Sequence, residues 1–571
     1  MINNNLTIRI VGESGEGIVS TGEILSHILK GLGQQLMTFR TYPAEIKGGQ
    51  CLFQLRFAEK PLHTPGEDPE ILICFDEKSY FEHGIKKDNG LLIYNSDDTA
   101  PENHKPLVAL GLPFTTISRD EIGVMQSKNM VALGAIGNLL NINKEQLHQF
   151  TKKWFRSKGE KAVEANTKAL LAGWEFCAEN YENPDKLFEQ AKQKNTVLLS
   201  GNQALVLGAL AAGCRFYAGY PITPASNIME MMIRELPKFG GVGLQTEDEM
   251  AAVSAVIGAS FAGTKAMTAT SGPGFSLMQE QIGLAVMAEI PIVIIDAQRA
   301  GPSTGMPTKM EQGDLLMAIH GSHGEAPRIV LAPGTVDECF STTVAAFNLA
   351  EALRAPVVLL TDLVLAQRTE SINLKSFKKP QIIDRKKWQS NEDQEHVPYK
   401  ITESGVSTMS MPGQMDAMYV ATGLEHDEQG RPNYTPAMHD KMLQKRHEKL
   451  NGAFAYYKGY QLFHGDASNN NVGIISWGST QGPILEALDL LAAESVHIPL
   501  LQLKLLNPLP LAAINEFAKS VEKLVVPEHN YTGQLAGLIE AGIHRPVIRL
   551  RKVEGLPFHP SELAKKLKTF I

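Results

Sequence analysis

The sequence lacks the features that mark secreted, membrane-embedded or cluster-binding chains. Its 571 residues include five cysteines, an odd number, and no two of them are spaced as CxxC. Such scattered cysteines are expected to be buried thiols, and they argue against an iron–sulfur cluster held by this chain alone. No segment approaches about 18 consecutive apolar residues, and the N-terminus has no cationic stretch before an apolar run. We therefore expect no membrane span and a cytoplasmic location.

The chain also lacks an excess of positive charge. Its formal net charge is −8 at pH 7, and no large basic block offsets this balance, so we do not expect a nucleic-acid partner. What remains, with 43% hydrophobic and 20% charged residues, 49 glycines and 31 prolines, is typical of a globular protein with many turns. The length predicts about three or four domains.

The order of strand-like and helix-like segments predicts a multidomain α/β fold. Residues 1–182 begin with an alternating apolar run from Leu6 to Val11, a glycine-rich turn and a helix-like stretch from Ile18 to Leu32. Residues 183–195 are polar and predict a linker. Further strands of the first domain are expected at 51–57, 70–75 and 90–94.

A strand and a helix that follow Thr196 open the second predicted domain, 196–371, whose alternating pattern indicates a parallel sheet. Residues 372–465 are richer in charge and proline, and we interpret them as an irregular insertion or connection. Residues 466–571 resume the alternation as a third α/β domain. Strands of these two domains are expected at 266–270, 291–296, 356–361, 472–477, 496–503 and 523–527.

A glycine-rich turn, Gly12-Glu-Ser-Gly15-Glu-Gly17, lies between the first strand and the first helix. Backbone N–H groups in this setting can receive a phosphate. The order of glycines is GxxGxG rather than GxGxxG, however, and the two glutamates would repel an anion. A tight turn without a ligand is therefore the favoured interpretation, and a nucleotide site stays open as the alternative.

In the second domain a stiff loop, Tyr220-Pro221-Ile222-Thr223-Pro224, follows a predicted strand. The two prolines fix φ and bias the preceding residues towards extended backbone, so the loop presents the Thr223 hydroxyl rigidly. A rigid hydroxyl suits the positioning of a ligand. The alternative is that Thr223 caps the helix that follows.

Three carboxylates, Glu247, Asp248 and Glu249, precede a segment that is small and apolar on every face. This pattern predicts a helix that is buried along most of its length. The helix dipole favours acids at an N-terminus, so two of the three need have no other role. One carboxyl group that enters an apolar site could share a proton with a ligand nitrogen.

Two further loops, 270–274 (TSGPG) and 298–305 (QRAGPSTG), follow predicted strands. Ligands of open α/β sheets bind at this carboxyl edge. Arg299 comes directly after the second of these strands, and its planar guanidinium is suited to clamping a carboxylate. An ion pair with a nearby acid is the structural alternative.

The segments YPITP (220–224), EDEMAA (247–252), TSGPG and QRAGPSTG, in this order, resemble the pyrimidine-binding domain of the 2-oxoacid:ferredoxin oxidoreductases. The N-terminal GESGEG and PAEIKGG segments resemble the γ domain of that family, and the third domain resembles its transketolase-C-type domain. The resemblance covers nearly the whole chain. It implies a fused γ–α subunit, most like the α subunit of the enzymes that act on 2-oxoglutarate.

The resemblance implies thiamine diphosphate as the cofactor. In the family, a buried glutamate hydrogen-bonds the aminopyrimidine ring and promotes formation of the reactive ylid, a role that corresponds to Glu249, with Glu247 as the second choice. The threonine and the arginine that hold the 2-oxoacid carboxylate correspond to Thr223 and Arg299. The residues expected beside the cofactor are Tyr220, Pro221, Ser271 and Gly272.

Lys47 is the candidate residue for substrate specificity. It lies in the segment 43–49 (PAEIKGG), which resembles the γ-domain loop that approaches the substrate, where an arginine is frequent. Lys47 keeps the positive charge and could bind the distal carboxylate of 2-oxoglutarate. Contact with a coenzyme A phosphate and simple solvation stay open as alternatives.

The family pattern for Mg²⁺ and the diphosphate, GDG followed by a more distant asparagine, is not matched here. Gly465-Asp466 is followed by alanine, and the asparagines from Asn469 to Asn471 come too soon. The resemblance therefore places Mg²⁺ and a [4Fe–4S] cluster in a separate β subunit. Four histidines without metal-ligand spacing are expected on the surface or in loops: His426, His439, His447 and His464.

The implied reaction is the oxidative decarboxylation of 2-oxoglutarate with coenzyme A to succinyl-CoA, CO₂ and reduced ferredoxin, or its reverse. The implied partners are the β subunit and ferredoxin, in a dimer of αβ heterodimers. The same chemistry on pyruvate or another 2-oxoacid stays open. So does a non-catalytic subunit that binds a nucleotide or serves as a scaffold for the β chain.

Overall fold

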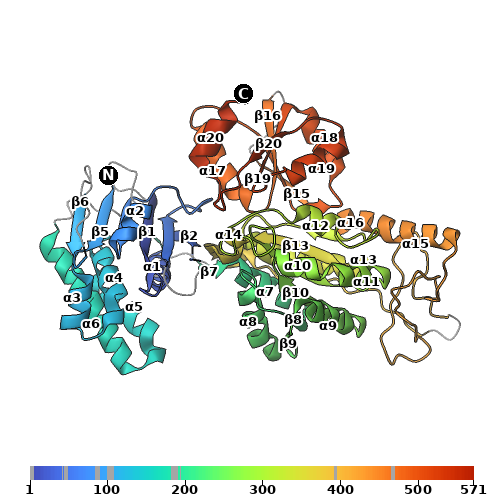
Figure 1. Cartoon of the computed structure of the whole chain (residues 1–571), viewed down its shortest axis with the longest axis horizontal. Helices are drawn as coiled ribbons and strands as arrows, with labels where there is room; N and C mark the ends of the chain where they lie inside the picture. Colours follow the sequence, from blue (N-terminus) through green and yellow to red (C-terminus); the bar gives the residue numbers. More distant parts are fainter. Residues whose placement is uncertain are drawn as a thin grey trace. The chain divides into compact units, whose positions relative to one another are not determined.

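The computed structural model describes residues 5–41, 43, 49–83, 90–98, 108–181, 191–192, 195–390, 395–463 and 470–571. The chain forms two compact units (Figure 1). Unit 1 comprises Met1–Leu199 and Arg368–Lys375, and unit 2 comprises Ser200–Gln367 and Ser376–Ile571. None of the helices in the described part of the chain combines the length and the hydropathy that a bilayer span requires.

Unit 1 is built on a mixed sheet of eight described strands. The strands are β1 (Asn5–Glu13), β2 (Gln35–Thr41), β3 (Gln50–Ala58), β4 (Ile71–Cys74), β5 (Leu91–Asn95), β6 (Val108–Leu112), β7 (Thr196–Ser200) and β14 (Thr369–Asn373). Their order is β6-β5-β4-β1-β3-β2-β14-β7, so β1 lies inside the sheet, parallel to β4 and antiparallel to β3. The helices are α1 (Ile18–Gly31), α2 (Glu77–His83), α3 (Phe114–Thr116), α4 (Lys128–Leu139), α5 (Lys144–Phe155) and α6 (Glu160–Asn180).

The strand β7 lies in a different sheet from the one that we expected. Its sequence, TVLLS, predicted the first strand of the second domain, but β7 pairs at the edge of the first sheet beside β14. Four of its five residues are only half-buried, as suits an edge strand. Strand propensity reports that a segment fits a pleated sheet and does not report which sheet it joins, so the prediction was wrong on this point.

Unit 2 contains a seven-stranded sheet that is parallel except for one edge strand, β18, and this confirms the predicted parallel sheet. Its order is β18-β12-β13-β11-β10-β8-β9. The strands are β8 (Phe216–Gly219), β9 (Val242–Gln245), β10 (Ala266–Thr270), β11 (Val293–Gln298), β12 (Ile329–Leu331), β13 (Val357–Asp362) and β18 (Leu505–Asn507). The helices before residue 370 are α7 (Gly201–Ala211), α8 (Ser226–Glu235), α9 (Glu249–Phe261), α10 (Gly272–Leu277), α11 (Gln279–Met287), α12 (Leu315–His320), α13 (Val336–Leu353) and α14 (Leu363–Gln367).

The C-terminal part of unit 2 forms a five-stranded sheet in the order β15-β17-β16-β19-β20. The strands are β15 (Tyr460–Phe463), β16 (Asn470–Trp477), β17 (Leu500–Leu503), β19 (Val521–Glu528) and β20 (Ile548–Arg551), and the helices are α17 (Gln481–Ala492), α18 (Leu511–Lys519), α19 (Gln534–Ile543) and α20 (Pro560–Lys568). The two sheets of unit 2 share one apolar core, which includes Val330, Trp477 and Phe517. In addition, β18 comes from the C-terminal part of the chain and pairs with β12.

The stretch that we expected to be irregular, 372–465, contains a regular helix. Within its described residues lie α15 (Pro436–Glu448), the short α16 (Ala453–Tyr456) and the strand β15. Proline stands at the first position of α15, and Lys445, Arg446 and His447 stand in its last turn, which are the usual signals for the two ends of a helix. Those signals were present in the sequence, and the charged composition of the segment concealed them.

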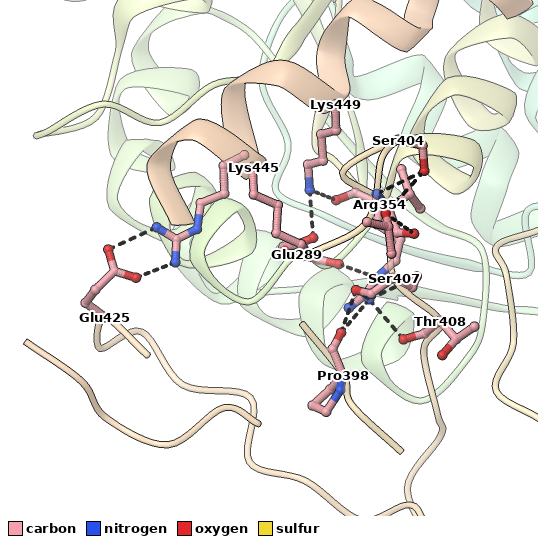
Figure 2. A network of polar contacts seen from close by, with 12 residues as sticks. Glu289, Arg354, Pro398, Ser404, Ser407, Thr408, Glu425, Lys445 and Lys449 are labelled. Atoms are coloured by element: carbon pink, nitrogen blue, oxygen red, sulfur yellow. Dashed lines mark hydrogen bonds and ion pairs between the residues drawn. The ribbon is translucent and has the colours of Figure 1, made fainter. Parts of the chain in front are cut away.

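A buried polar network holds this segment on the seven-stranded sheet domain (Figure 2). The carboxylate of Glu289, which is fully buried, pairs with Lys445 and with Lys449 (Nζ–Oε2 3.1 Å). The Arg354 guanidinium, also fully buried, donates to the carbonyls of Glu289 (3.2 Å) and Pro398 (2.9 Å). The network therefore joins three segments that are distant in the sequence.

The structure also tests the predicted burial of one histidine and of the five cysteines. His426 is fully buried, with its ring 4.1 Å from that of Tyr399, so it is not at the surface, and of the two positions that we predicted for this histidine only the loop remains. His426 does lie in a loop, and its Nδ1 is 3.0 Å from the carbonyl oxygen of Leu424, which satisfies one of its polar atoms. All five cysteines are buried free thiols, as predicted.

Replacing Glu289 with glutamine is expected to lower the free energy of unfolding by about 3–5 kcal/mol, because two lysines would lose their buried countercharge. Burial by itself would raise the pKa of the Glu289 carboxyl. The charges of its cationic neighbours outweigh burial, so the pKa lies well below its usual range. A carboxyl group whose pKa is lower in the folded state stabilises the fold at pH values above its ordinary pKa. This contribution is lost as the pH falls from the ordinary pKa to the lowered one.

Urea unfolding at neutral and acidic pH measures this effect. The wild type should lose stability in acid, and Glu289→Gln should lose less because the titrating group is gone. Glu494→Gln is the matched control, since Glu494 pairs with Lys568 at the surface and such pairs contribute less than about 1 kcal/mol. Equal stability of the Glu289 variant and the wild type at neutral pH would contradict the assignment.

Candidate active site

Four neighbouring strands of unit 2, β11, β10, β8 and β9, run parallel, so their carboxyl ends lie at the same edge of the sheet. The loops that we singled out in the sequence follow these strands. The segment 220–225 follows β8, the carboxylates follow β9, and the loops beginning at Ser271 and Arg299 follow β10 and β11. These motifs therefore share one edge of the sheet.

A hydrogen bond from the start of α7 holds the loop after β8 in place. Asn202, which is buried at the start of α7, donates from Nδ2 to the carbonyl oxygen of Pro224 (2.9 Å). Thr223 does not cap the next helix, because the N-cap of α8 is Ala225 and no side chain provides the cap. Thr223 and Tyr220 are exposed, so both side chains are accessible at the edge of the sheet.

Arg299 is joined to this loop. Its Nη1 donates to the carbonyl oxygen of Thr223 (2.9 Å), whereas its Nε is buried and has no partner among the described residues. Burial lowers the pKa of Arg299, and the charge of Asp314 opposes this shift. The guanidinium is thus tethered through one nitrogen to a carbonyl rather than closed into a carboxylate pair, which leaves donors for an anionic ligand.

The three carboxylates before α9 have different surroundings in the structure. The side chain of Asp248 caps the helix by accepting from the N–H of Ala251 (2.7 Å), and Glu247 is exposed. Glu249 is only 6% exposed, and its carboxyl group has no hydrogen-bond partner among the described residues. Only Glu249 therefore has the surroundings of a carboxyl group kept for a ligand.

The loop after β10 packs tightly against Glu249. A methyl group on Gly274 would collide with the Glu249 carboxyl and with the Thr270 hydroxyl, so a residue without a side chain is required there. Ser271 is fully buried and donates from Oγ to the carbonyl oxygen of Ala297 (2.8 Å), which ties this loop to β11. The loop thus lies between Glu249 and the strand that leads to Arg299.

We expected helix α9 to be buried along most of its length, but one of its sides is exposed. Met250, Ser254 and Gly258 lie four residues apart and form an exposed stripe. On the edge strand β9, Val242 and Leu244 are also exposed, with Val242 at 57%. An apolar sequence indicates that a helix will be covered, but the described residues leave one face of α9 exposed.

The predicted site residues thus divide into three groups. Thr223 and Arg299 are in contact, and Glu249 lies at the same edge beside Gly274. Tyr220 and Pro221 are exposed on the loop after β8. Ser271 and the half-buried Gly272 belong to the segment that follows β10. Lys47 lies outside the described residues, as do Gly465, Asp466 and His464.

The glycine-rich turn of unit 1 uses its own N–H groups. Ser14 N donates to the carbonyl oxygen of Gly49 (3.0 Å), and Glu13 N donates to Glu16 Oε2 (3.3 Å). Burial raises the pKa of Glu16, and Lys128 opposes the shift. A turn closed in this way supports the interpretation of a structural turn over that of a phosphate site.

Sequence models of three related domain families match the chain in succession. Residues 7–176 match pyruvate ferredoxin/flavodoxin oxidoreductase, residues 207–445 match the thiamine diphosphate-binding domain of pyruvate flavodoxin/ferredoxin oxidoreductase, and residues 470–561 match core domain II of pyruvate:ferredoxin oxidoreductase. The chain is 30% identical to the α subunit of 2-oxoacid:ferredoxin oxidoreductase 2 of Aeropyrum pernix, over 99% of this chain and 98% of that protein. The chain belongs to the 2-oxoacid:ferredoxin oxidoreductase family.

Relatives of this oxidoreductase chain include proteins named for 2-oxoglutarate. It is 32% identical to the 2-oxoglutarate oxidoreductase subunit KorA of Mycobacterium tuberculosis, over 99% of this chain and 91% of that protein. A solved structure of 2-oxoglutarate:ferredoxin oxidoreductase from Magnetococcus marinus, with 2-oxoglutarate, coenzyme A and succinyl-CoA bound, is 38% identical over the whole of both chains, with a TM-score of 0.94. The α/β fold expected for the family is confirmed.

The residues present in this oxidoreductase fit a thiamine cofactor at the edge described above. A thiazolium cofactor with an aminopyrimidine ring needs a carboxyl group that can share a proton with a ring nitrogen, and the unpartnered, buried Glu249 carboxyl meets this need. The glycine at 274 keeps the space beside that carboxyl free of a side chain. Ser271 and Gly272 continue the same wall.

Two site carboxylates of this oxidoreductase were not singled out from the sequence. Asp296 interrupts the buried strand VIIDAQ, and Asp314 precedes α12. An acid in the middle of a continuous apolar strand was a usable signal, because a buried charge is costly unless it has a partner. The identity of the partner could not be obtained from the sequence, since it depends on how the loop after β11 folds back.

Proposed function

We propose that this chain is the fused γ–α subunit of an enzyme that oxidatively decarboxylates 2-oxoglutarate with coenzyme A, forming succinyl-CoA and CO₂ and reducing ferredoxin, or running in reverse. The observation that carries the proposal is the shared edge on which an unpartnered Glu249 carboxyl and the partly free Arg299 guanidinium lie. The names of the relatives that align over the full chain support 2-oxoglutarate as the substrate.

Each side chain has a distinct task in the proposed reaction. Arg299, held by the Thr223 carbonyl, binds the carboxylate next to the keto group and orients it, and the Thr223 hydroxyl is offered as a second donor. Glu249 holds or takes a proton at the pyrimidine nitrogen. Thiamine diphosphate, when bound, supplies the electron sink for loss of CO₂. Tyr220, Pro221, Ser271 and Gly272 would surround it.

A second subunit completes the proposed site. The Mg²⁺-binding pattern of thiamine enzymes is not matched in this sequence, and we propose that the β subunit supplies it together with a [4Fe–4S] cluster. The exposed apolar side chains of Val242 and Leu244 on β9 and of Met250 on α9 support a partner beside the site. A dimer of αβ heterodimers in the cytoplasm remains our expectation. Lys47 remains the proposed cation for the distal carboxylate.

The test is turnover of the reconstituted complex. The chain, co-purified with its β subunit, should reduce ferredoxin when given thiamine diphosphate, Mg²⁺, 2-oxoglutarate and coenzyme A, and the chain alone should be inactive. Comparison of kcat/KM for 2-oxoglutarate, pyruvate and branched-chain or aryl 2-oxoacids assigns the substrate. A higher kcat/KM for another 2-oxoacid would replace 2-oxoglutarate, and no turnover with any 2-oxoacid would overturn the proposal.

A further inference from the structure

Gln312 joins the loop after β11 to the C-terminal part of unit 2. The residue is only 1% exposed, and its backbone and side-chain polar groups all have partners in that part. Its N–H donates to the carbonyl oxygen of His529 (2.8 Å), and its carbonyl oxygen accepts from Nδ2 of Asn530 (3.0 Å). Its side chain accepts from the N–H of His529 (3.1 Å) and donates from Nε2 to the carbonyl oxygen of Trp477 (3.2 Å). A buried glutamine bonded in this way fixes the position of one segment against the other.

A second glutamine of the C-terminal part, Gln534 at the start of α19, holds the residues that follow Gln312. Its Nε2 donates to the carbonyl oxygen of Gly313 (2.7 Å), and its Oε1 accepts from the N–H of Leu316 (3.0 Å). The other contacts come from the ends of β16 and β19, which are parallel neighbours. The carboxyl edge of the five-stranded sheet therefore holds the segment 311–314.

This segment in turn supports the residues on both sides of Arg299. Gln298, the residue before Arg299, is 1% exposed and accepts at Oε1 from the N–H of Asp314 (3.1 Å). Gly301, two residues after Arg299, donates from its N–H to Oε2 of Glu311 (3.1 Å). The backbone that carries the Arg299 guanidinium is thus hydrogen-bonded on each side to the segment that the C-terminal part holds.

The chain between these two points has fewer constraints. Residues 301–306 are exposed, and the loop closes on itself through Ala300. The N–H of Ala300 donates to the carbonyl oxygen of Lys309 (3.0 Å), and its carbonyl oxygen accepts from the N–H of Met306 (2.9 Å). Because exposed loop backbone opens easily, the direction of Arg299 depends on the hydrogen bonds at the base of the loop.

We propose that Gln312 is a positioning residue for Arg299, and that the C-terminal part of unit 2 thereby contributes to binding of the 2-oxoacid. Gln312 fixes the segment 311–314, which holds the backbone around Arg299 so that the guanidinium stays against the Thr223 carbonyl. A guanidinium that is already oriented loses less conformational freedom when a carboxylate binds, so binding is stronger. The inference deepens the proposed function and rests on it for the identity of the ligand.

The first measurement follows amide hydrogen exchange in the purified full-length chain and needs no turnover. Gln312→Leu removes the two side-chain hydrogen bonds, and we expect the amides of Ala300 and Gly301 to exchange about tenfold faster than in the wild type. The amides of β8 should keep their rates. Unchanged exchange at Ala300 and Gly301 would overturn the proposal, whether or not the complex turns over a 2-oxoacid.

The second measurement uses the complete enzyme. Gln312→Leu should raise KM for the 2-oxoacid about tenfold and keep kcat within about twofold of the wild type, because Arg299 is assigned to substrate binding. Deuterium exchange at C2 of the bound thiamine cofactor, which is assigned to Glu249, should keep its wild-type rate. A fall in kcat and in C2 exchange with unchanged KM would show general damage to the site and would refute the positioning role.

The double variant Arg299→Ala/Gln312→Leu tests whether Gln312 acts through Arg299. If it does, the double variant should lose no more kcat/KM than Arg299→Ala alone, because the group that Gln312 positions is already absent. Losses that multiply would mean that the two residues act independently, and the proposal would be wrong.

Gln534→Ala weakens the hold on the same segment from a half-buried position, so it should change KM and amide exchange in the same direction by a smaller factor. It decides the question if Gln312→Leu does not fold, since wild-type exchange at Ala300 and Gly301 in Gln534→Ala would then count against the proposal. Loss of all turnover in the wild-type complex would refute the proposed function instead, and the exchange rates would still test the hold on the loop.

The matched control is Gln414→Leu. Gln414 also donates to a carbonyl oxygen, that of Trp388 (3.1 Å), and accepts from an N–H, that of Met411 (3.3 Å). It lies in the segment 372–465, outside the candidate site, so its loss should leave KM and the exchange at Ala300 and Gly301 unchanged. Equal effects of Gln414→Leu and Gln312→Leu would show that the loss of any such glutamine has this result and would refute a specific role for Gln312.

Discussion

Replacing Glu249 with glutamine is expected to lower kcat of the complete enzyme by about 10²–10⁴-fold, the usual contribution of a positioned acid or base. Glutamine has nearly the same shape and fits beside Gly274, but it cannot exchange a proton with a ligand nitrogen. The loss should therefore be in cofactor activation and not in folding. Deuterium exchange at C2 of the bound thiamine cofactor should slow in parallel with turnover.

The neighbouring acid provides a matched control. Glu247 stands two residues earlier, carries the same charge and is exposed, so Glu247→Gln should leave turnover nearly unchanged. Asp248 is unsuitable as a control because it caps α9. A large loss in Glu247→Gln together with wild-type rates in Glu249→Gln would reverse the assignment between the two glutamates.

Replacing Arg299 with alanine is expected to lower kcat/KM for 2-oxoglutarate on the order of 10²–10³-fold. Removing one member of a partly buried, hydrogen-bonded charge pair costs about 2–5 kcal/mol, and the carboxylate of the substrate would lose its partner. Arg299→Lys should retain part of the activity, because it keeps the charge and loses the planar fork. Steady-state kinetics of the two variants in the complex measure both effects.

The control for this prediction is Arg119→Ala, which removes an exposed arginine that pairs with Asp120 in unit 1. Its kcat/KM should match that of the wild type. Because Arg299 is assigned to the carboxylate that all 2-oxoacids share, Arg299→Ala should impair 2-oxoglutarate and pyruvate to a similar extent. A loss confined to 2-oxoglutarate would instead place Arg299 at the distal carboxylate.

The sequence was most informative where local pattern decides structure. The alternating run before the glycine turn, the strands of the parallel sheet and the loops at their carboxyl ends all follow from the periodicity and from the positions of glycine and proline. The parallel arrangement also placed the motifs at one edge, since all crossover connections bring carboxyl ends to the same side. Choosing among Glu247, Asp248 and Glu249 required the structure, because the three neighbours have the same local pattern.

The sequence was least informative where charged residues are buried. Lys445 and Lys449 are the kind of residue expected at a solvated surface, yet both are buried around Glu289, which is 156 residues from Lys445 in the chain. The strand β7 shows the same difficulty, because its sequence predicts a strand without indicating which sheet it joins. The exposed face of α9 could not be predicted either. An apolar helix has the same sequence pattern whether it packs against its own chain or against a partner.

By itself the sequence determined the order of the α/β elements, the edge of the sheet where ligands bind and the residue types available there. Only the tertiary structure decided that Arg299 contacts the Thr223 carbonyl, and that of the three carboxylates before α9 only Glu249 is buried with no hydrogen-bond partner among the described residues. The physical reason is that element type depends on side chains a few positions apart, whereas the charge and the protonation of a group depend on everything that surrounds it in space.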